Sequence, residues 1–132
     1  MILVREILLP KSIDEVCRLL QNNNGLSKII AGGTDIVPGF HIESPRFTNI
    51  ERLIDINNVN ELKTVSVLDG YISIGSAISF SELISNPVIN EKLPLLVKAS
   101  RTIGSTQIRN RATLGGNFIN NAPCADSVAP LL

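Results

Sequence analysis

Two short glycine-containing segments carry the residue types that bind phosphate groups. The first is Ala31-Gly32-Gly33-Thr34-Asp35, which directly follows the apolar residues of a predicted buried strand. Two glycines let the backbone approach a ligand without a Cβ in the way, and successive N–H groups in such a turn form a nest for an anion. Thr34 adds a hydroxyl donor, and Asp35 suits a ribose or ribityl hydroxyl. Taken alone, the segment fits a tight turn with an aspartate cap better than a binding site, and it lacks the third glycine of the dinucleotide-binding fingerprint.

The second segment is Ala112-Thr113-Leu114-Gly115-Gly116-Asn117. Two glycine loops that converge can hold one diphosphate through backbone donors and threonine hydroxyls, without many lysines. The residues fit a second interpretation equally well. In it, the glycine pair marks a bulge or a strand end, while Arg109 and Arg111 are solvated surface charges.

A third polar segment, residues 120–127, precedes an apolar stretch at residues 128–132. Asp126 is expected to cap a helix there, and it can instead reach a ligand hydroxyl from the same position. The chain has two cysteines, Cys17 and Cys124, and one histidine, His41. Cys17 falls on the apolar face of a predicted helix, so neither a disulfide scaffold nor a metal site is expected.

Composition excludes several classes of protein. The 132 residues include 12 Lys plus Arg and 12 Asp plus Glu, so no global field attracts nucleic acid or an anionic membrane. The apolar runs are too short to span a bilayer, and residues 1–10 lack the order of a signal peptide. A cytoplasmic location, no nucleic-acid partner and no membrane partner are therefore expected.

The first half of the chain predicts a small strand-helix-strand lobe. Val4–Leu8 and Lys28–Ala31 are expected as strands, and a capping box of Ser12 and Glu15 is expected to open a helix over Ile13–Asn22 between them. The two strands are expected to be parallel. Residues 32–44 are interpreted as a loop and Arg52–Ile56 as a further strand, which ends the lobe near residue 56.

The second half predicts an antiparallel start followed by helices. Residues 57–60 form a polar turn, and Asp69-Gly70 between Lys63–Leu68 and Tyr71–Ser76 is the strongest hairpin signal in the sequence. A second capping box, Ser79 with Glu82, opens a short helix, and Pro94 starts another.

Taken together, these motifs resemble one family. The order is Ala31–Asp35, then Ile103-Gly104-Ser105 with Gln107-Ile108-Arg109-Asn110, then Ala112–Asn117, and last Pro123 with Ala125-Asp126-Ser127. The pattern is similar to the FAD-binding subunits of molybdenum hydroxylases, a group that includes xanthine dehydrogenases and carbon monoxide dehydrogenases. The similarity covers nearly the whole chain, and the last three motifs together are specific. The run from Gln107 to Asn117 argues against another enzyme of the same fold, an enolpyruvylglucosamine reductase.

The resemblance implies a truncated α+β fold of the vanillyl alcohol oxidase type, with a βαβ lobe at 1–56 and the start of a second lobe at 57–132. It implies FAD, held without a covalent bond, as the cofactor, and no catalytic side chain or metal ligand on this chain. An iron-sulfur small subunit and a molybdenum-cofactor large subunit are the implied partners, with NAD as an acceptor. The implied FAD contacts are Ile29, Ile30, Ala31, Gly32, Gly33, Thr34, Asp35, Ile36, Ile103, Thr113, Leu114, Gly115, Gly116, Asn117 and Asp126.

Family members are more than twice as long as this chain, so a fragment is expected. Its implied role is to carry electrons from iron-sulfur clusters through FAD to an acceptor. The alternative is a binding module that keeps the fold but has lost FAD and redox activity.

Overall fold

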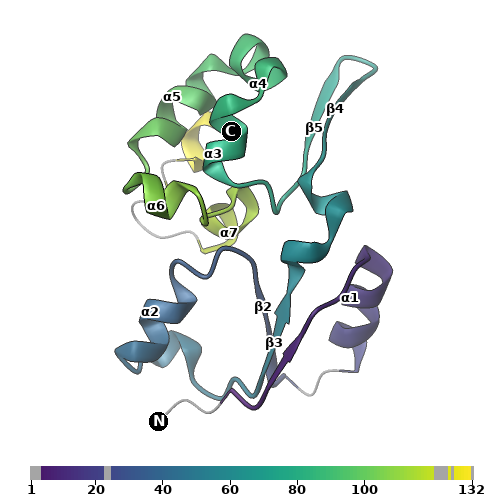
Figure 1. The fold of residues 1–132 in the computed structure, drawn as a ribbon, viewed down its shortest axis with the longest axis vertical. Helices are drawn as coiled ribbons and strands as arrows, with labels where there is room; N and C mark the ends of the chain where they lie inside the picture. The colour runs from purple at the N-terminus through teal and green to yellow at the C-terminus, as the bar shows by residue number, and fades with distance from the viewer. Residues whose placement is uncertain (1–3, 23–24, 121–124, 126, 132) are drawn as a thin grey trace.

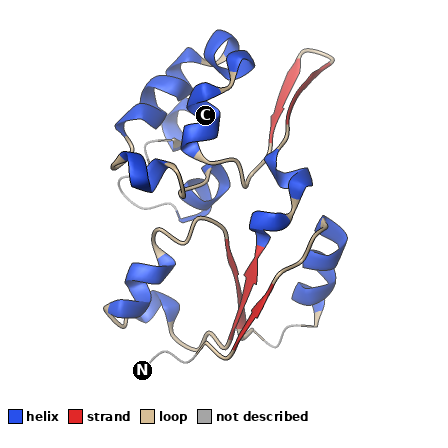
Figure 2. Ribbon diagram, viewed as in Figure 1, coloured by secondary structure: helices blue, strands red, loops and turns tan. Residues whose placement is uncertain are grey.

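The structure is a computed structural model that describes residues 4–22, 25–120, 125 and 127–131. Its lower part is a three-stranded parallel sheet of β1 (Glu6–Leu8), β3 (Arg52–Asp55) and β2 (Ser27–Ile30), shown in Figures 1 and 2. The parallel direction predicted for the first two strands is confirmed, because both run parallel to β3. They do not pair with each other, since β3 lies between them.

Two helices cover opposite faces of this sheet, as Figure 1 shows. Neighbouring residues of β3 point to opposite faces, so Ile54 packs with Val16 of α1 (Ile13–Gln21) while Leu53 packs with Ile36 of α2 (Ile36–His41). The two central residues of β3 are apolar and buried, as a strand covered on both faces requires. The short central strand therefore anchors both helices.

The start of α1 differs in detail from the predicted capping box. The Ser12 hydroxyl accepts the N–H of Glu15 as expected, but the Glu15 carboxylate accepts the N–H of Lys11, one residue earlier than the motif requires. The prediction that Cys17 lies on the apolar face is wrong, because its side chain is exposed. The helix turns Val16, Leu19 and Leu20 towards the sheet instead.

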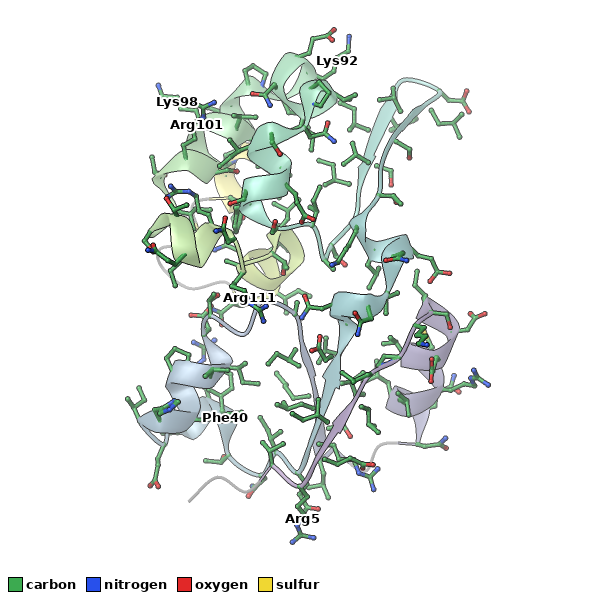
Figure 3. The ribbon with its side chains drawn as sticks, viewed as in Figure 1. Arg5, Phe40, Lys92, Lys98, Arg101 and Arg111 are labelled. Atoms are coloured by element: carbon green, nitrogen blue, oxygen red, sulfur yellow. The ribbon has the colours of Figure 1, made fainter. Side chains whose placement is uncertain are left out.

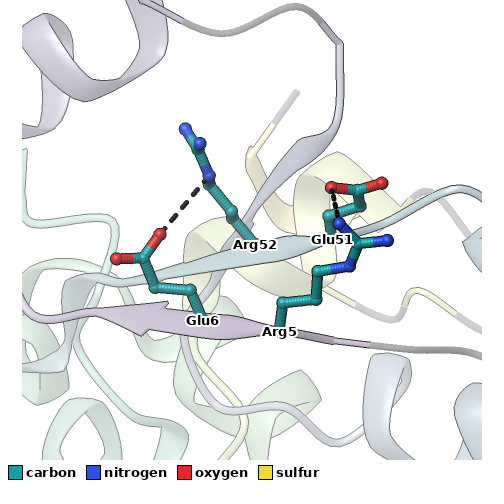
Figure 4. Close-up of polar contacts among 4 residues, drawn as sticks. All are labelled: Arg5, Glu6, Glu51 and Arg52. Atoms are coloured by element: carbon teal, nitrogen blue, oxygen red, sulfur yellow. Dashed lines mark ion pairs between the residues drawn. The ribbon is translucent and has the colours of Figure 1, made fainter.

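Exposed ion pairs lie across the β1–β3 pair (Figure 4). Arg5 contacts Glu51 at 3.5 Å, and Arg52 contacts Glu6 at 3.4 Å. Pairs in contact with solvent contribute little free energy of folding. Both arginines, Arg5 and Arg52, are thus paired with carboxylates at this part of the sheet.

The interpretation of residues 32–44 as a loop is wrong, because they contain α2. Pro38 and Gly39 lower the helix propensity of this stretch, which hides the helix in the sequence. Packing overrides propensity: Ile36 and Phe47 form a core with Ile50 and Leu53, and a Cβ on Gly39 would overlap the Phe47 ring. Phe47 belongs to a short 3-10 turn, Pro45–Phe47, that closes the segment.

The predicted hairpin is confirmed. Strands β4 (Val65–Leu68) and β5 (Tyr71–Ile74) pair antiparallel around Asp69 and Gly70, whose φ angles are +50° and +81°. Two positive φ angles match the turn type that suits the twist of hairpin strands. Two 3-10 turns precede it, Ile56–Asn58 and Asn60–Lys63, where the sequence predicts a polar turn.

A cluster of short helices forms the upper part of the molecule. Its innermost side chains are Phe80, Leu83, Ile89 and Leu96, each at most 1% exposed. The helices predicted after Ser79 and at Pro94 are confirmed, whereas α4, α6 and α7 were not predicted. The helices are α3 (Phe80–Ser85), α4 (Pro87–Lys92), α5 (Pro94–Thr102), α6 (Thr106–Arg109), α7 (Leu114–Asn120) and α8 (Val128–Leu131). The predicted cap Asp126 lies outside the described residues.

The core of the parallel sheet extends past the predicted lobe boundary. Val59 and Ala77 pack with Ile54 and Ile56 rather than with the helical cluster. Because this core includes residues from both predicted lobes, it does not define a boundary at residue 56, and that division stays a prediction. In the part of the chain that the structure describes, no helix has the length and apolar character needed to span a membrane.

The capping box at α3 generates the first prediction. Ser79 accepts the N–H of Glu82 at 3.2 Å, and the Glu82 carboxylate accepts both the N–H and the hydroxyl of Ser79. We expect Ser79→Ala to lower the free energy of unfolding by about 1 kcal/mol. The measurement is thermal unfolding followed by circular dichroism, where this loss corresponds to a midpoint lower by about 4 °C. Ser66→Ala on the exposed part of β4 is the control and should leave the midpoint unchanged.

The same contact predicts a pH dependence. The hydrogen bond from the Ser79 side chain, then that from its backbone, holds the pKa of Glu82 below its usual value. A carboxylate whose folded pKa is lowered stabilises the fold above its ordinary pKa, and that contribution is lost as the pH falls through the lowered pKa. The stability difference between the parent and Glu82→Gln should therefore shrink on acidification. A difference that grows towards low pH would contradict this assignment.

Candidate functional site

The first glycine motif lies at the carboxyl end of β2, between that strand and α2. Its position is fixed from the neighbouring strand, because the Asn57 side chain donates to the Ala31 carbonyl at 2.8 Å. Asn57 is itself held by the Asp55 carboxylate through its backbone and side-chain N–H groups, at 2.9 and 2.7 Å. Ligands of open α/β sheets bind outside the carboxyl ends of the strands, and this turn occupies such a position.

Backbone donors are the main feature of this turn. The N–H groups of Gly32, Gly33, Thr34, Asp35 and Ile36 have no hydrogen-bond acceptor among the described residues, whereas the next N–H, of Val37, bonds to the Gly33 carbonyl. Gly33 has φ +73°, a left-handed conformation that L side chains adopt only with strain. Successive free amides around a left-handed residue form an anion-binding nest.

The side chains of Thr34 and Asp35 are also available to a ligand. Asp35 occupies the cap position of α2, yet its carboxylate makes no capping hydrogen bond and is exposed. The interpretation of Asp35 as a helix cap is therefore wrong. Thr34 is half-buried, and its hydroxyl has no acceptor or donor in the described part of the chain.

The second glycine motif is built differently from the expected loop, because it forms the first turn of α7. Its N–H groups are used within the chain: Leu114 donates to Ile78 at 3.0 Å, Gly115 to Ser76 at 2.8 Å, and Asn117 to Thr113 at 3.0 Å. Gly116 donates to the Thr113 hydroxyl at 3.2 Å. Gly115 is required because a Cβ there would lie 2.8 Å from the Ser76 carbonyl oxygen. The interpretation of the glycine pair as a bulge or strand end is wrong as well.

The two motifs are in direct contact. A Cβ on Gly32 would overlap the Arg111 carbonyl and lie 2.9 Å from the Ala112 Cα, so the β2–α2 turn packs on the backbone just before α7. The turn and α7 are neighbours in Figure 1. This contact brings together segments about 80 residues apart in the sequence. Whether Gly33 and Gly116 line one cleft stays a prediction, since the contact itself is made by Gly32.

A side-chain contact also joins the same two parts of the molecule. The Arg46 guanidinium donates to both oxygens of Asn120, at the end of α7, and stacks 5.5 Å from the centre of the Phe47 ring. Neither Arg46 nor Asn57 was singled out from the sequence. Each acts on a backbone oxygen or amide far along the chain, and no local pattern reports such a partner.

The turn at Ile103 is held by an arginine. Arg109 donates to the carbonyls of Ile103 and Gly104, both at 3.0 Å, and to the Thr106 hydroxyl at 3.1 Å. The interpretation of Arg109 as a solvated surface charge is therefore wrong. The Ile103 side chain is buried in the core of the helical cluster.

The other residues predicted to contact FAD differ in their exposure. Ile29 is 41% exposed on β2, whereas Ile30 and Ile36 pack into the core beneath α2. Leu114 is buried, and Gly116 is exposed. Asp126 lies outside the described residues. Next to it, Ser127 is buried and donates its hydroxyl to Asn117, which ties this segment to α7.

Within the described ranges, no group of three or more histidine, cysteine, aspartate or glutamate side chains is placed to hold a metal ion. The site thus consists of backbone donors and hydroxyls at the end of a parallel sheet. Such donors suit the oxygens of a phosphorylated ligand, and the fold is that of an α+β protein.

Comparison with known proteins identifies the family. The model of the FAD-binding domain in molybdopterin dehydrogenases matches residues 4–132, and the chain belongs to this family. A putative xanthine dehydrogenase FAD-binding subunit of Escherichia coli is 41% identical over 111 residues, which are 83% of this chain and 37% of that protein. The carbon monoxide dehydrogenase medium chain of Hydrogenophaga pseudoflava is 36% identical over 120 residues, which are 91% of this chain and 41% of that protein.

Solved structures agree with this assignment. Carbon monoxide dehydrogenase from Hydrogenophaga pseudoflava superimposes with a TM-score of 0.84 at 36% identity, covering 93% of this chain and 42% of that chain. Quinoline 2-oxidoreductase from Pseudomonas putida superimposes with a TM-score of 0.80 at 28% identity, over 89% and 40% of the two chains. The predicted fold class is confirmed. The chain spans about two fifths of the length of these relatives.

The contact at Gly32 generates the second prediction. Because Gly32 meets backbone atoms that cannot rotate away, Gly32→Ala should force the two motifs apart and lower the free energy of unfolding by about 2–3 kcal/mol. Gly70→Ala is the control: it also adds one methyl group, but into open space at φ +81°, and should cost about 1 kcal/mol from backbone strain alone. Urea unfolding followed by circular dichroism measures both. Equal losses in the two variants would show that the contact is loose.

Proposed function

We propose that this chain supplies the diphosphate-binding part of an FAD site. The observation that carries the proposal is the run of five N–H groups from Gly32 to Ile36 that have no acceptor among the described residues, in a turn packed against the backbone that leads into α7. A diphosphate needs several converging donors and close backbone approach, and this turn offers both. Membership of an FAD-binding family supports the same ligand.

The proposed roles follow from what each residue has available. The backbone of Gly32–Ile36 and the Thr34 hydroxyl donate to phosphate oxygens, while Asp35 accepts a hydroxyl of the ribityl or ribose group. The second motif contributes mainly shape, because the amides of Leu114–Asn117 are already bonded within the chain. Its surface next to the turn and the segment of Asp126 complete the proposed contacts, with Ile29, Ile30, Ala31 and Ile103 at the margins.

The wider activity is a proposal drawn from the relatives. Bound FAD supplies the redox chemistry, and the protein positions it. We propose that the longer protein that includes this domain is an oxidoreductase subunit, which receives electrons from iron-sulfur clusters of a small subunit and works with a molybdenum-containing large subunit. NAD is the proposed acceptor. Relatives named as FAD-binding subunits and medium chains support this role, and they do not favour the non-redox alternative.

The third prediction tests the diphosphate site. Gly33→Val places a β-branched side chain at φ +73° and should distort the run of free amides. Losing two hydrogen bonds to charged oxygens, each worth about 1.5–3 kcal/mol, weakens FAD binding by roughly a hundredfold or more. Thr34→Val keeps the side-chain shape and removes one donor, so it should weaken binding by roughly tenfold. Quenching of FAD fluorescence during titration measures both affinities.

The controls separate binding from folding. Lys98→Ala, on the exposed side of α5 (Figure 3), should bind FAD like the parent. Gly116→Val is the comparison at the second motif, where a Cβ would come 2.8 Å from the Thr113 hydroxyl oxygen. Circular dichroism must show each variant to be folded. If Gly33→Val and Gly116→Val both bind as tightly as the parent, the diphosphate is held elsewhere. A parent chain that binds no FAD would support the non-redox alternative.

A further inference from the structure

We propose that Arg111 is a specificity-determining residue of this site, and that its guanidinium binds the diphosphate. This inference rests on the proposed function. It adds the one component that the turn at Gly32–Ile36 lacks, a positive charge. The sequence alone leaves open whether Arg111 is a solvated surface charge.

Arg111 lies where the two motifs meet. Its carbonyl is the group that Gly32 packs against, so its Cα is next to the turn that carries the free amides. The residue is held there on both sides, because its N–H donates to Ile108 at 3.0 Å and the following Ala112 carbonyl accepts the N–H of Phe80 at 3.1 Å. Figure 3 shows the side chain between the β2–α2 turn and α7. A bound anion at the turn is therefore within reach of an arginine side chain.

The guanidinium of Arg111 is also free for a ligand. The Arg111 side chain is exposed and has no ion pair or hydrogen bond with any described residue. The other arginines around the two motifs are occupied: Arg109 bonds to the turn at Ile103, and Arg46 bonds to Asn120. Arg52 is paired with Glu6 on β1, and Arg5 is paired with Glu51, just before β3.

The charge of a diphosphate favours a cation at this site. Free amides stabilise an anion only through partial charges, and a diphosphate brings two full negative charges next to the Asp35 carboxylate. The chain has a formal net charge of zero, so no distributed field compensates for them. A guanidinium binds phosphate oxygens in bidentate fashion and stays charged at every accessible pH. Arg111 would thereby favour flavin nucleotides that carry a diphosphate over flavins that do not.

The test compares variants of Arg111 with a matched arginine. We expect Arg111→Gln to weaken FAD binding by about tenfold and Arg111→Lys to weaken it less, because one charge-assisted contact is removed or replaced. The control is Arg101→Gln on α5, which removes an exposed arginine away from the motifs (Figure 3) and should leave affinity unchanged. Fluorescence titrations at low and high salt should show a weaker salt dependence for Arg111→Gln than for the parent.

Competition identifies the group that Arg111 binds. ADP contains the diphosphate, so its inhibition constant against FAD should rise in Arg111→Gln by the same factor as the dissociation constant of FAD, whereas the inhibition constant of riboflavin, which has no phosphate, should be equal in both proteins. If the parent binds FAD but Arg111→Gln matches it in affinity and salt dependence, the role of Arg111 is refuted and the amide site stands. If the parent does not bind FAD, both proposals fail.

Discussion

At Gly32 the chain has room for a hydrogen atom and nothing larger. The Arg111 carbonyl and the Ala112 Cα occupy the space of a side chain, so this glycine makes a close backbone contact between the parallel sheet and the helical cluster. Any Cβ would have to move backbone atoms that are fixed by hydrogen bonds to Ile108 and Phe80. The relative position of the two glycine motifs, and with it the shape of the proposed diphosphate site, depends on this contact.

The two motifs look alike in sequence but differ in how their backbone N–H groups are used. In the first, a left-handed glycine and the short helix α2 leave five successive amides without an acceptor in the part of the chain that the structure describes. In the second, the corresponding amides bond to Ser76, Ile78 and Thr113, so its glycines serve close packing. An anion gains most where donors are free in advance, because no internal hydrogen bond has to break. The backbone differs accordingly: Gly33 has a positive φ, whereas Gly115 and Gly116 are helical.

Sequence patterns predicted those elements whose signals are local. The hairpin at Asp69-Gly70, the capping box at Ser79 and the helix that begins at Pro94 follow from nearest-neighbour rules, and all three are present. Patterns failed where distant packing decides. Pro38 and Gly39 argue against a helix, yet α2 forms because Ile36 and the Phe47 ring pack in one core. The ring occupies the space next to Gly39 that a side chain would fill. The order β1-β3-β2 was likewise invisible, because nothing within a strand states which neighbour it takes.

The segment Ser76–Phe80, which leads from β5 into α3, connects the candidate site to the core of the helical cluster. Ser76 and Ile78 accept the first amides of α7, Ser79 caps α3, and Phe80, completely buried, donates to the Ala112 carbonyl. Ala112 then carries the backbone that Gly32 contacts. A shift in the core at Phe80 would therefore reach the turn at Gly32 through two backbone contacts, without passing through a flexible side chain. The turn itself lacks such support on its ligand side, where its five amides face no acceptor of the described chain. Rigid support behind unpaired donors is the arrangement that keeps a binding site organised before its ligand arrives.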